Sequence, residues 1–229
     1  MNTTIAENLS RVRTQMEAAC QAAGRPPHSV CLLAVSKTWG AEAVRTAHAA
    51  GQTAFGENYI QEAVDKIVAL RDLPLQWHCI GPIQSNKTRL VAEHFDWVHS
   101  VDRLKIAQRL SEQRPAHLPP LQVCLQVNID GGPTKAGVAS AEALALAQAV
   151  AALPRLKLRG LMTIPDALEG FDAQAAVHAQ AKRLWDELQI TLALPYFDTL
   201  SMGMSGDLEA AVQAGSTMVR VGTAVFGAR

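Results

Sequence analysis

The chain has 229 residues, and its 21 basic and 21 acidic side chains give a formal net charge of zero. With 18% charged residues it lacks the basic surface that nucleic acid or an anionic membrane would need, so we expect a small ligand. The length suits one large core, and no low-complexity linker divides the chain, so we predict a single domain over residues 1–229.

Features of the N-terminus and of the cysteines predict a cytoplasmic protein. Charged side chains stand in the first helical turns, which does not fit a signal peptide, and no apolar run reaches the ~18 residues of a membrane span. The four cysteines lie far apart and form no C-x-x-C pair: Cys20, Cys31, Cys79 and Cys124. We expect reduced thiols, three of them in buried strands.

The predicted elements alternate after an opening helix. Thr4 and Glu7 form a capping box ahead of apolar residues at helical spacing, and Gly24 with the prolines that follow ends this helix. Strands are predicted at 30–36, 53–56, 76–80, 97–100, 121–129, 158–162, 198–202 and 218–221. Helices are predicted at 41–50, 57–70, 86–94, 103–114, 140–153, 172–190 and 207–214.

Several predicted strands are nearly continuous in apolar residues, which is typical of strands covered on both faces in a parallel sheet. Eight strand–helix units predict an α/β fold, a single (β/α)8 TIM barrel with an extra N-terminal helix. A doubly wound open sheet is the competing architecture, and the length and the count of eight favour the barrel.

Lys37 ends an otherwise apolar run that starts at Val30, and Thr38, Trp39 and Gly40 break it. In one interpretation its amine is buried. Burial disfavours the charged form and leaves a neutral amine that can attack a carbonyl. The alternative is a strand-end lysine that reaches water or pairs with a carboxylate.

Two segments predict a phosphate site, because TIM barrels often bind phosphate after their last two strands. Ser201, Gly203 and Ser205 follow the seventh strand at alternate positions, and Gly222 with Thr223 follows the eighth. The hydroxyls and the glycine backbone could surround an anion. Alternatively, Ser205 only caps the helix that follows.

Arg220 lies two residues before Gly222 and therefore on the same face of the last strand. Its partner is either a carboxylate of a neighbouring strand, such as Glu57, or a heteroatom of a ligand. PLP, pyridoxal 5′-phosphate, has an aldehyde that a lysine can bind, a phosphate that such a cup can hold and a ring nitrogen that an arginine can face, so these residues together fit PLP as the cofactor.

His78 is predicted to be a core histidine, and the histidine spacing indicates no metal site.

Five segments in order resemble the pyridoxal phosphate homeostasis protein family: 34–37 (AVSK), 55–59 (FGENY), 78–87 (HCIGPIQSNK), 201–205 (SMGMS) and 219–227 (VRVGTAVFG). The resemblance implies a Schiff base on Lys37 and Arg220 facing the pyridine nitrogen. It places these residues around the phosphate: Ser201, Gly203, Ser205, Gly222 and Thr223. Asn58 is implied as a ring neighbour. Trp39 and Gly40 depart from the expected pattern, in which a lysine–proline pair follows the threonine.

The same resemblance implies a barrel like that of alanine racemase, a monomer, and a part in intracellular PLP homeostasis by supplying or buffering the cofactor. Barrel-type racemases complete their site with a further domain, for which the chain leaves no room after strand eight, so we expect a carrier rather than an enzyme. A weakly active, PLP-dependent racemase-like enzyme is the alternative, and a cofactor-free aldolase using Lys37 is a third hypothesis.

A carrier that holds its cofactor covalently needs a route for release, so we expect two further features. Transient contacts with PLP-requiring apo-enzymes would deliver it, and a second lysine near the mouth could accept the aldehyde as it leaves Lys37. Lys135 is preferred over Lys87 for this step, because the stretch 130–134 before it contains a glycine pair. For either lysine, the alternative is a solvated loop residue.

Overall fold

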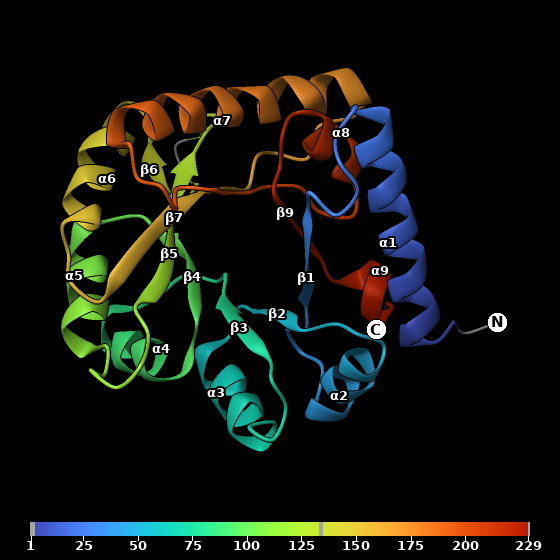
Figure 1. Ribbon diagram of the computed structural model, residues 1–229, viewed down its shortest axis with the longest axis horizontal. Helices are drawn as coiled ribbons and strands as arrows, with labels where there is room; N and C mark the ends of the chain where they lie inside the picture. The colour runs from blue at the N-terminus through green and yellow to red at the C-terminus, as the bar shows by residue number, and fades with distance from the viewer. Residues whose placement is uncertain (1–2, 133–134, 229) are drawn as a thin grey trace.

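The structure is a computed structural model that describes residues 3–132 and 135–228 (Figure 1). Pro133 and Thr134, which belong to the stretch 130–134 before Lys135, lie outside the described residues. Eight parallel strands form the barrel: β1 (Cys31–Val35), β2 (Ala54–Glu57), β3 (Gln76–Cys79), β4 (Trp97–Val101), β5 (Leu121–Asn128), β7 (Leu156–Thr163), β8 (Thr199–Ser201) and β9 (Met218–Val221). The barrel closes because β1 pairs with β9 and β4 pairs with β5.

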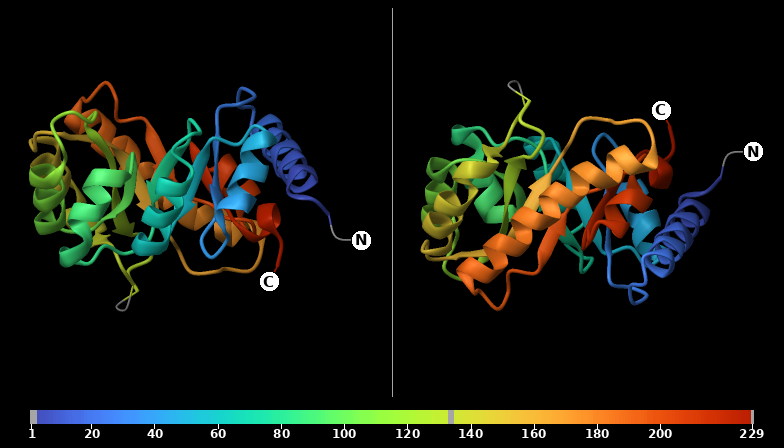
Figure 2. Two further views of the ribbon diagram at one scale, coloured as in Figure 1. Left: turned by 90° about the horizontal axis from the view of Figure 1, so that it is seen from below. Right: turned by 90° about the horizontal axis from the view of Figure 1, so that it is seen from above.

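Helices surround this ring of strands, and the long helix α7 crosses the outside of the barrel (Figure 1, Figure 2). Their bounds are α1 (Ile5–Ala22), α2 (Ala41–Ala49), α3 (Ile60–Ala69), α4 (Thr88–His94), α5 (Leu104–Gln113), α6 (Ala143–Ala151), α7 (Phe171–Leu192), α8 (Leu208–Gln213) and α9 (Thr223–Phe226). The 3-10 turns η1 (Ser85–Lys87) and η2 (Ser140–Glu142) precede α4 and α6. The prediction of a (β/α)8 barrel with an N-terminal helix is confirmed.

The opening helix α1 begins where the capping box predicts. Thr4 Oγ1 accepts a hydrogen bond from Glu7 N at 3.2 Å, and the Glu7 carboxylate accepts one from Thr4 N at 2.7 Å. The apolar face of α1, with Leu9 and Val12 buried, packs against α8 and α9. This extra helix therefore covers the region where the last strand meets the first.

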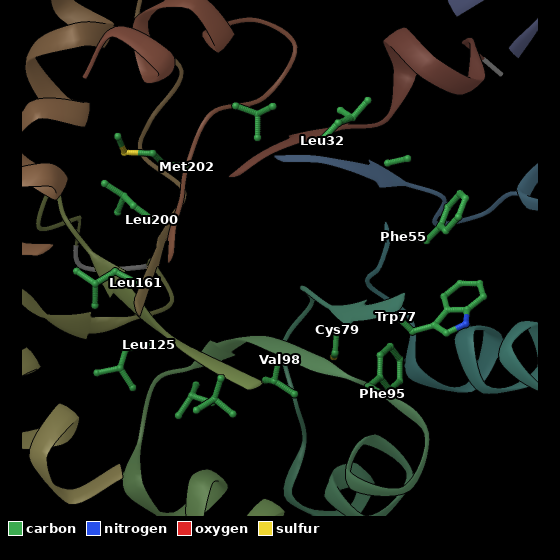
Figure 3. Packing of buried hydrophobic residues seen from close by; sticks show 14 of the residues in the cluster. Leu32, Phe55, Trp77, Cys79, Phe95, Val98, Leu125, Leu161, Leu200 and Met202 are labelled. Atoms are coloured by element: carbon green, nitrogen blue, oxygen red, sulfur yellow. The ribbon is translucent and has the colours of Figure 1, made fainter. Parts of the chain in front are cut away.

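Side chains on each strand alternate between the helices and the barrel interior. Leu32 and Ala34 of β1 belong to the large core between strands and helices, which Figure 3 follows around the barrel. Leu33, between them, packs instead with Ala54 and Met218 in a small cluster inside the barrel. Full burial of each such leucine contributes about 1.5–3 kcal/mol. Both faces are apolar, which explains the nearly continuous apolar runs.

Two elements were not predicted. β6 (Val138–Ala139) pairs with Val127 and Asn128 at the end of β5, and at two residues it is too short to show a period. α9 continues from the end of β9 after Gly222. Within the two described ranges, no helix is long and apolar enough to cross a membrane.

Candidate functional site

The predicted site residues come together at the carboxyl ends of four neighbouring strands. The sheet order places β2, β1, β9 and β8 side by side. Lys37 follows β1, Asn58 follows β2, and Arg220 lies in β9 with its residue paired to Leu33 of β1. In a parallel barrel these ends form one mouth.

Lys37 lies in a tight turn just beyond β1. Trp39 N donates to Ser36 O at 3.1 Å across this turn, and Thr38 has a positive φ of 67°. The Lys37 side chain is exposed, so the interpretation with a buried amine is wrong and the lysine reaches water instead: the strand ends at Val35, and the turn carries Lys37 out of the wall. Among the described residues, no hydrogen-bond or ion-pair partner engages its amine, so a carboxylate partner is not found either.

Arg220 is buried inside the barrel, with 4% of its surface exposed. Its guanidinium donates to Ser201 O at 2.8 Å, to Ser201 Oγ at 2.9 Å and to Thr163 O at 2.8 Å. Burial lowers the pKa of Arg220 to about 10, which leaves it charged at neutral pH. The side chain is thus held rigidly by strands β7 and β8.

The alternative in which Arg220 pairs with Glu57 is wrong. A Cβ on Gly56 would point at the Leu33 side chain, inside the barrel, so the next residue, Glu57, faces the helices. There the Glu57 carboxylate pairs with Lys66 of α3 at 2.5 Å. The strand wall separates it from Arg220.

A chain of hydrogen bonds runs from Arg220 across the barrel interior. Ser201 Oγ lies 3.0 Å from His99 Nδ1, His99 Nε2 lies 2.9 Å from His78 Nδ1, and His78 Nε2 lies 3.1 Å from Gln76 Oε1. Burial lowers the pKa of His78 to about 3 and that of His99 well below its ordinary value, so both rings are neutral. Because the Gln76 oxygen only accepts, each ring donates toward Gln76, and the Ser201 hydroxyl donates to His99.

The prediction that His78 is a core histidine is confirmed, since its ring is fully buried and stacks on Trp97 at 5.2 Å. His99 was not predicted. Its signal is the alternation of Trp97 and His99 on β4, which puts both on the inner face beside His78.

The loop after β8 turns at a glycine. Gly203 has a φ of 94°, and a Cβ there would lie 2.5 Å from the Ala211 Cβ, so only glycine fits. Met204 N donates to Asp207 Oδ1 at 2.6 Å, which fixes the loop in front of Ser205. Ser205 is exposed, and it does not cap α8, because Asp207 holds the N-cap position.

Asp207 connects this loop to α7. Its Oδ2 lies 2.9 Å from Nε2 of the buried His178. Burial opposes ionisation of Asp207, but hydrogen bonds from His178 and Met204 outweigh it, so the pKa of Asp207 is lowered. Sequence patterns contain no signal for this contact, because the two residues lie 29 positions apart, His178 in α7 and Asp207 just ahead of α8.

The facing half of the predicted phosphate cup follows β9. Gly222 passes close to β1: a Cβ on it would lie 3.3 Å from Val35 O. Thr223 opens α9, so the first amides of that helix have no partner within it. Ser201, in contrast, is fully buried with its hydroxyl engaged by Arg220 and His99, so it faces the interior rather than the rim.

Two buried carbonyl oxygens at the mouth lack hydrogen-bond partners: Asn58 Oδ1 and Asn128 Oδ1. Asn58 is held close to the next loop, because a Cβ on Gly81 would lie 2.3 Å from Asn58 O, and Asn128 Nδ2 donates to Gly132 O at 2.8 Å. Buried acceptors of this kind cost free energy unless a ligand supplies donors. With the unpaired Lys37 amine, they fit a polar ring ligand such as PLP.

Lys135 and Lys87 differ in their surroundings. The Lys135 amine pairs with Asp130 and, at 2.8 Å, with Asp166. Partial burial works against its charge, but these hydrogen bonds prevail, and the pKa of Lys135 is raised. Lys87 ends η1 after β3, and no hydrogen bond or ion pair joins its amine to the described residues.

In the part of the chain that the structure describes, no cluster of three His, Cys, Asp or Glu side chains could hold a metal ion.

Comparison with known proteins gives the class of this barrel. Residues 6–229 match the family model of the alanine racemase N-terminal domain. Alanine racemase of Corynebacterium glutamicum has the same fold at a TM-score of 0.66 and 20% identity, over 96% of this chain and 59% of that one.

Other relatives are similar over nearly their full length. A pyridoxal phosphate homeostasis protein of Pseudomonas aeruginosa is 62% identical over 226 residues, which cover 99% of this chain and 96% of that protein. The Escherichia coli K12 protein of the same name is 55% identical over 98% of this chain and 97% of its own. The structure of PipY from Synechococcus elongatus PCC7942 with PLP bound superposes with a TM-score of 0.85 and 42% identity, over 98% of this chain and 100% of that one. The chain belongs to the pyridoxal phosphate homeostasis protein family.

Proposed function

We propose that this chain binds PLP at the barrel mouth, holds it as a Schiff base on Lys37, and supplies or buffers it in intracellular PLP homeostasis. The observation that carries the proposal is the unpaired Lys37 amine in the turn just beyond β1, the strand that pairs with β9, which bears the buried, rigidly held Arg220. The names of the relatives and the PLP bound to PipY support the same cofactor.

The proposed chemistry uses the neutral form of the Lys37 amine. Its nitrogen attacks the aldehyde carbon of PLP, a carbon–nitrogen double bond forms, and one water molecule leaves. Asn58 would lie beside the ring. The phosphate would be bound by Gly203, Ser205, Gly222 and Thr223, and Ser201 would act through its contact with Arg220 rather than by touching the phosphate.

The position proposed for the Arg220 cation, beside the ring nitrogen, fits a carrier better than it fits a strong catalyst. A fixed cation beside the pyridine nitrogen disfavours protonation of the ring and so weakens the ring as an electron sink. The alternative, a weak racemase-like activity, would need a second acid–base group opposite Lys37. Tyr59 is exposed just after β2 and is the candidate for that group.

Exposed apolar side chains follow several strands on the mouth side, and they support transient contacts with PLP-requiring apo-enzymes. They are Tyr59, Ile164, Leu168, Phe171 and Met204. Such a rim would let a monomeric carrier meet an acceptor with its loaded mouth. Rates of PLP transfer should then depend on the acceptor concentration and fall when Phe171 is replaced by Ser.

The test is an absorbance spectrum of the PLP-loaded protein before and after borohydride reduction. The wild type should show a visible band that reduction removes, with the phosphopyridoxyl mass on the peptide containing Lys37. Lys37→Ala should lose both, whereas Lys87→Ala, the matched control, should keep both. A full-occupancy adduct in Lys37→Ala would contradict the proposal.

A further inference from the structure

The turn that carries Lys37 is held from its helix-facing side by polar groups of β2 and α3. Lys66 Nζ donates to Ser36 O at 2.9 Å, and Ser36 Oγ donates to Glu57 Oε1 at 2.6 Å. On the other side of Lys37, Thr38 N donates to Glu62 Oε1 at 2.7 Å. Both residues that flank Lys37 are therefore fixed, while the Lys37 amine is left without a partner in the described chain.

Lys66 is the centre of this group. Its side chain is 4% exposed, and its amine uses its three donors on Ser36 O, on Glu57 Oε1 at 2.5 Å and on Glu62 Oε1 at 3.3 Å. Glu57 is 1% exposed, and burial raises its pKa despite Lys66. Removing two charges from water is costly, and a buried pair is poor evidence of stability for its own sake. A role in fixing one local conformation explains it better.

The local conformation is a strained one. Thr38 has a φ of 67°, and a β-branched side chain is a genuine outlier in this left-handed region. Strain of this kind persists only where the surroundings over-determine the backbone, and it gathers at functional sites. The hydrogen bond from Thr38 N to Glu62 is the contact that holds the strained residue.

We propose that Glu57, Glu62 and Lys66 are positioning residues that aim the Lys37 amine at the ligand. This inference rests on the proposed function. The Lys37 side chain has no polar anchor of its own, so its direction is set by the backbone of Ser36 and Thr38. Loosening that backbone lowers the fraction of time in which the amine faces the aldehyde, and it leaves the phosphate loop and Arg220 on β8 and β9 untouched.

The experiment compares two ligands on four proteins. PLP reports both binding and bond formation with Lys37, whereas pyridoxine 5′-phosphate carries an alcohol in place of the aldehyde and reports binding alone. The proteins are wild type, Glu62→Ala, Glu62→Gln and the control Asp65→Ala, which alters an exposed residue on the same helix. Stopped-flow absorbance gives the rate of bond formation, and calorimetry gives the affinity for pyridoxine 5′-phosphate.

We expect Glu62→Ala to slow bond formation about tenfold, because a charge-assisted hydrogen bond to the backbone is lost. Glu62→Gln, which keeps an acceptor for Thr38 N, should recover most of the rate, and Asp65→Ala should match wild type. Pyridoxine 5′-phosphate should bind all four proteins equally. A fifth protein, Ser36→Ala on the other flank, should also slow the reaction with PLP and leave the binding of pyridoxine 5′-phosphate unchanged.

Equal rates in wild type and Glu62→Ala would overturn the inference, and so would a parallel loss of affinity for both ligands, which would mean a general structural role. Either result leaves the proposed function intact if wild type still forms the reducible adduct on Lys37. Absence of that adduct in wild type would instead overturn the proposed function on which the inference rests.

Discussion

Arg220 donates to both oxygens of Ser201, at 2.8 Å to the backbone carbonyl and at 2.9 Å to the hydroxyl. The hydroxyl hydrogen then points to His99, so the guanidinium is tied to a neutral chain that ends at Gln76. Each hydrogen bond along this chain therefore has one assigned donor and one assigned acceptor. Arg220 therefore reaches the mouth as a fixed cation that need not reorganise when a ligand arrives.

With PLP bound, the pyridine nitrogen should be unprotonated in wild type, because Arg220 stays charged. Nitrogen-15 NMR of ring-labelled PLP measures this directly. Arg220→Glu should protonate the nitrogen and permit racemase or transaminase side reactions. It should also cost about 2–4 kcal/mol of unfolding free energy, because the carbonyl oxygens of Ser201 and Thr163 lose their donor. A protonated ring in the wild type would refute the quiet-carrier interpretation.

The buried histidines should make the apo-protein sensitive to mild acid. The pKa of His78 is about 3 when folded and that of His99 is also depressed, whereas an unfolded histidine takes a proton near pH 6.5. Below that pH only the unfolded state gains these protons, so stability is lost as pH falls. Urea unfolding should show a loss of about 2–3 kcal/mol between pH 7.5 and 5.5.

A matched pair of variants tests the source of this acid sensitivity. His99→Gln should reduce the slope by about half if it folds, since one of two titrating rings is removed. His28→Gln, at an exposed site, should leave the slope unchanged. A flat profile in the wild type would show that the two rings are not held neutral.

Asp207 should support phosphate recognition by holding the backbone of Met204. Asp207→Ala removes the acceptor of Met204 N and should weaken pyridoxine 5′-phosphate binding about tenfold. Asp207→Asn keeps an oxygen for that amide and should stay within about threefold of wild type. Pyridoxal, which lacks the phosphate, serves as the control ligand. If Asp207→Ala weakened pyridoxal equally, the effect would not be on the phosphate loop.

The barrel could be predicted from sequence because its strands bury both faces, so apolar runs such as that ending at Val35 mark them without an alignment. Residues past the strand ends could be placed at the mouth for the same reason. The partner of Arg220 could not, since the choice between Glu57 and another group depends on which face of β2 the carboxylate occupies. Gly56 and Glu57 face opposite sides of β2, so the side that Glu57 faces is known only once Gly56 has been placed in the barrel interior.

The choice between a buried and an exposed Lys37 and the contact between Asp207 and His178 also lay beyond sequence reasoning. The first depends on a turn with Thr38 in a conformation that threonine rarely adopts, against its propensity. The second depends on how α7 packs beside the loop after β8. Propensity and period report local structure and carry no information on such packing.

Two mechanisms predict opposite effects of Lys135→Ala on the rate of PLP transfer. If its amine accepted the aldehyde during release, Lys135→Ala would slow PLP transfer to an apo-enzyme. The structure instead shows the amine paired with Asp130 and Asp166, with a raised pKa, which keeps it protonated and poorly nucleophilic. These pairs tie the loop after β5 to the loop after β7, both on the mouth side.

We therefore expect Lys135→Ala to free these loops and to raise the transfer rate, by at most about fivefold because ion pairs near the surface are worth about 1 kcal/mol or less. Asp166→Asn, which weakens the same tie without touching an amine, should act in the same direction. The measurement is transfer from protein loaded to equal occupancy, in low and high salt. A slower rate in Lys135→Ala, with a normal rate in Asp166→Asn, would restore the amine as the acceptor. Lys87→Ala tests the other candidate amine in the same assay.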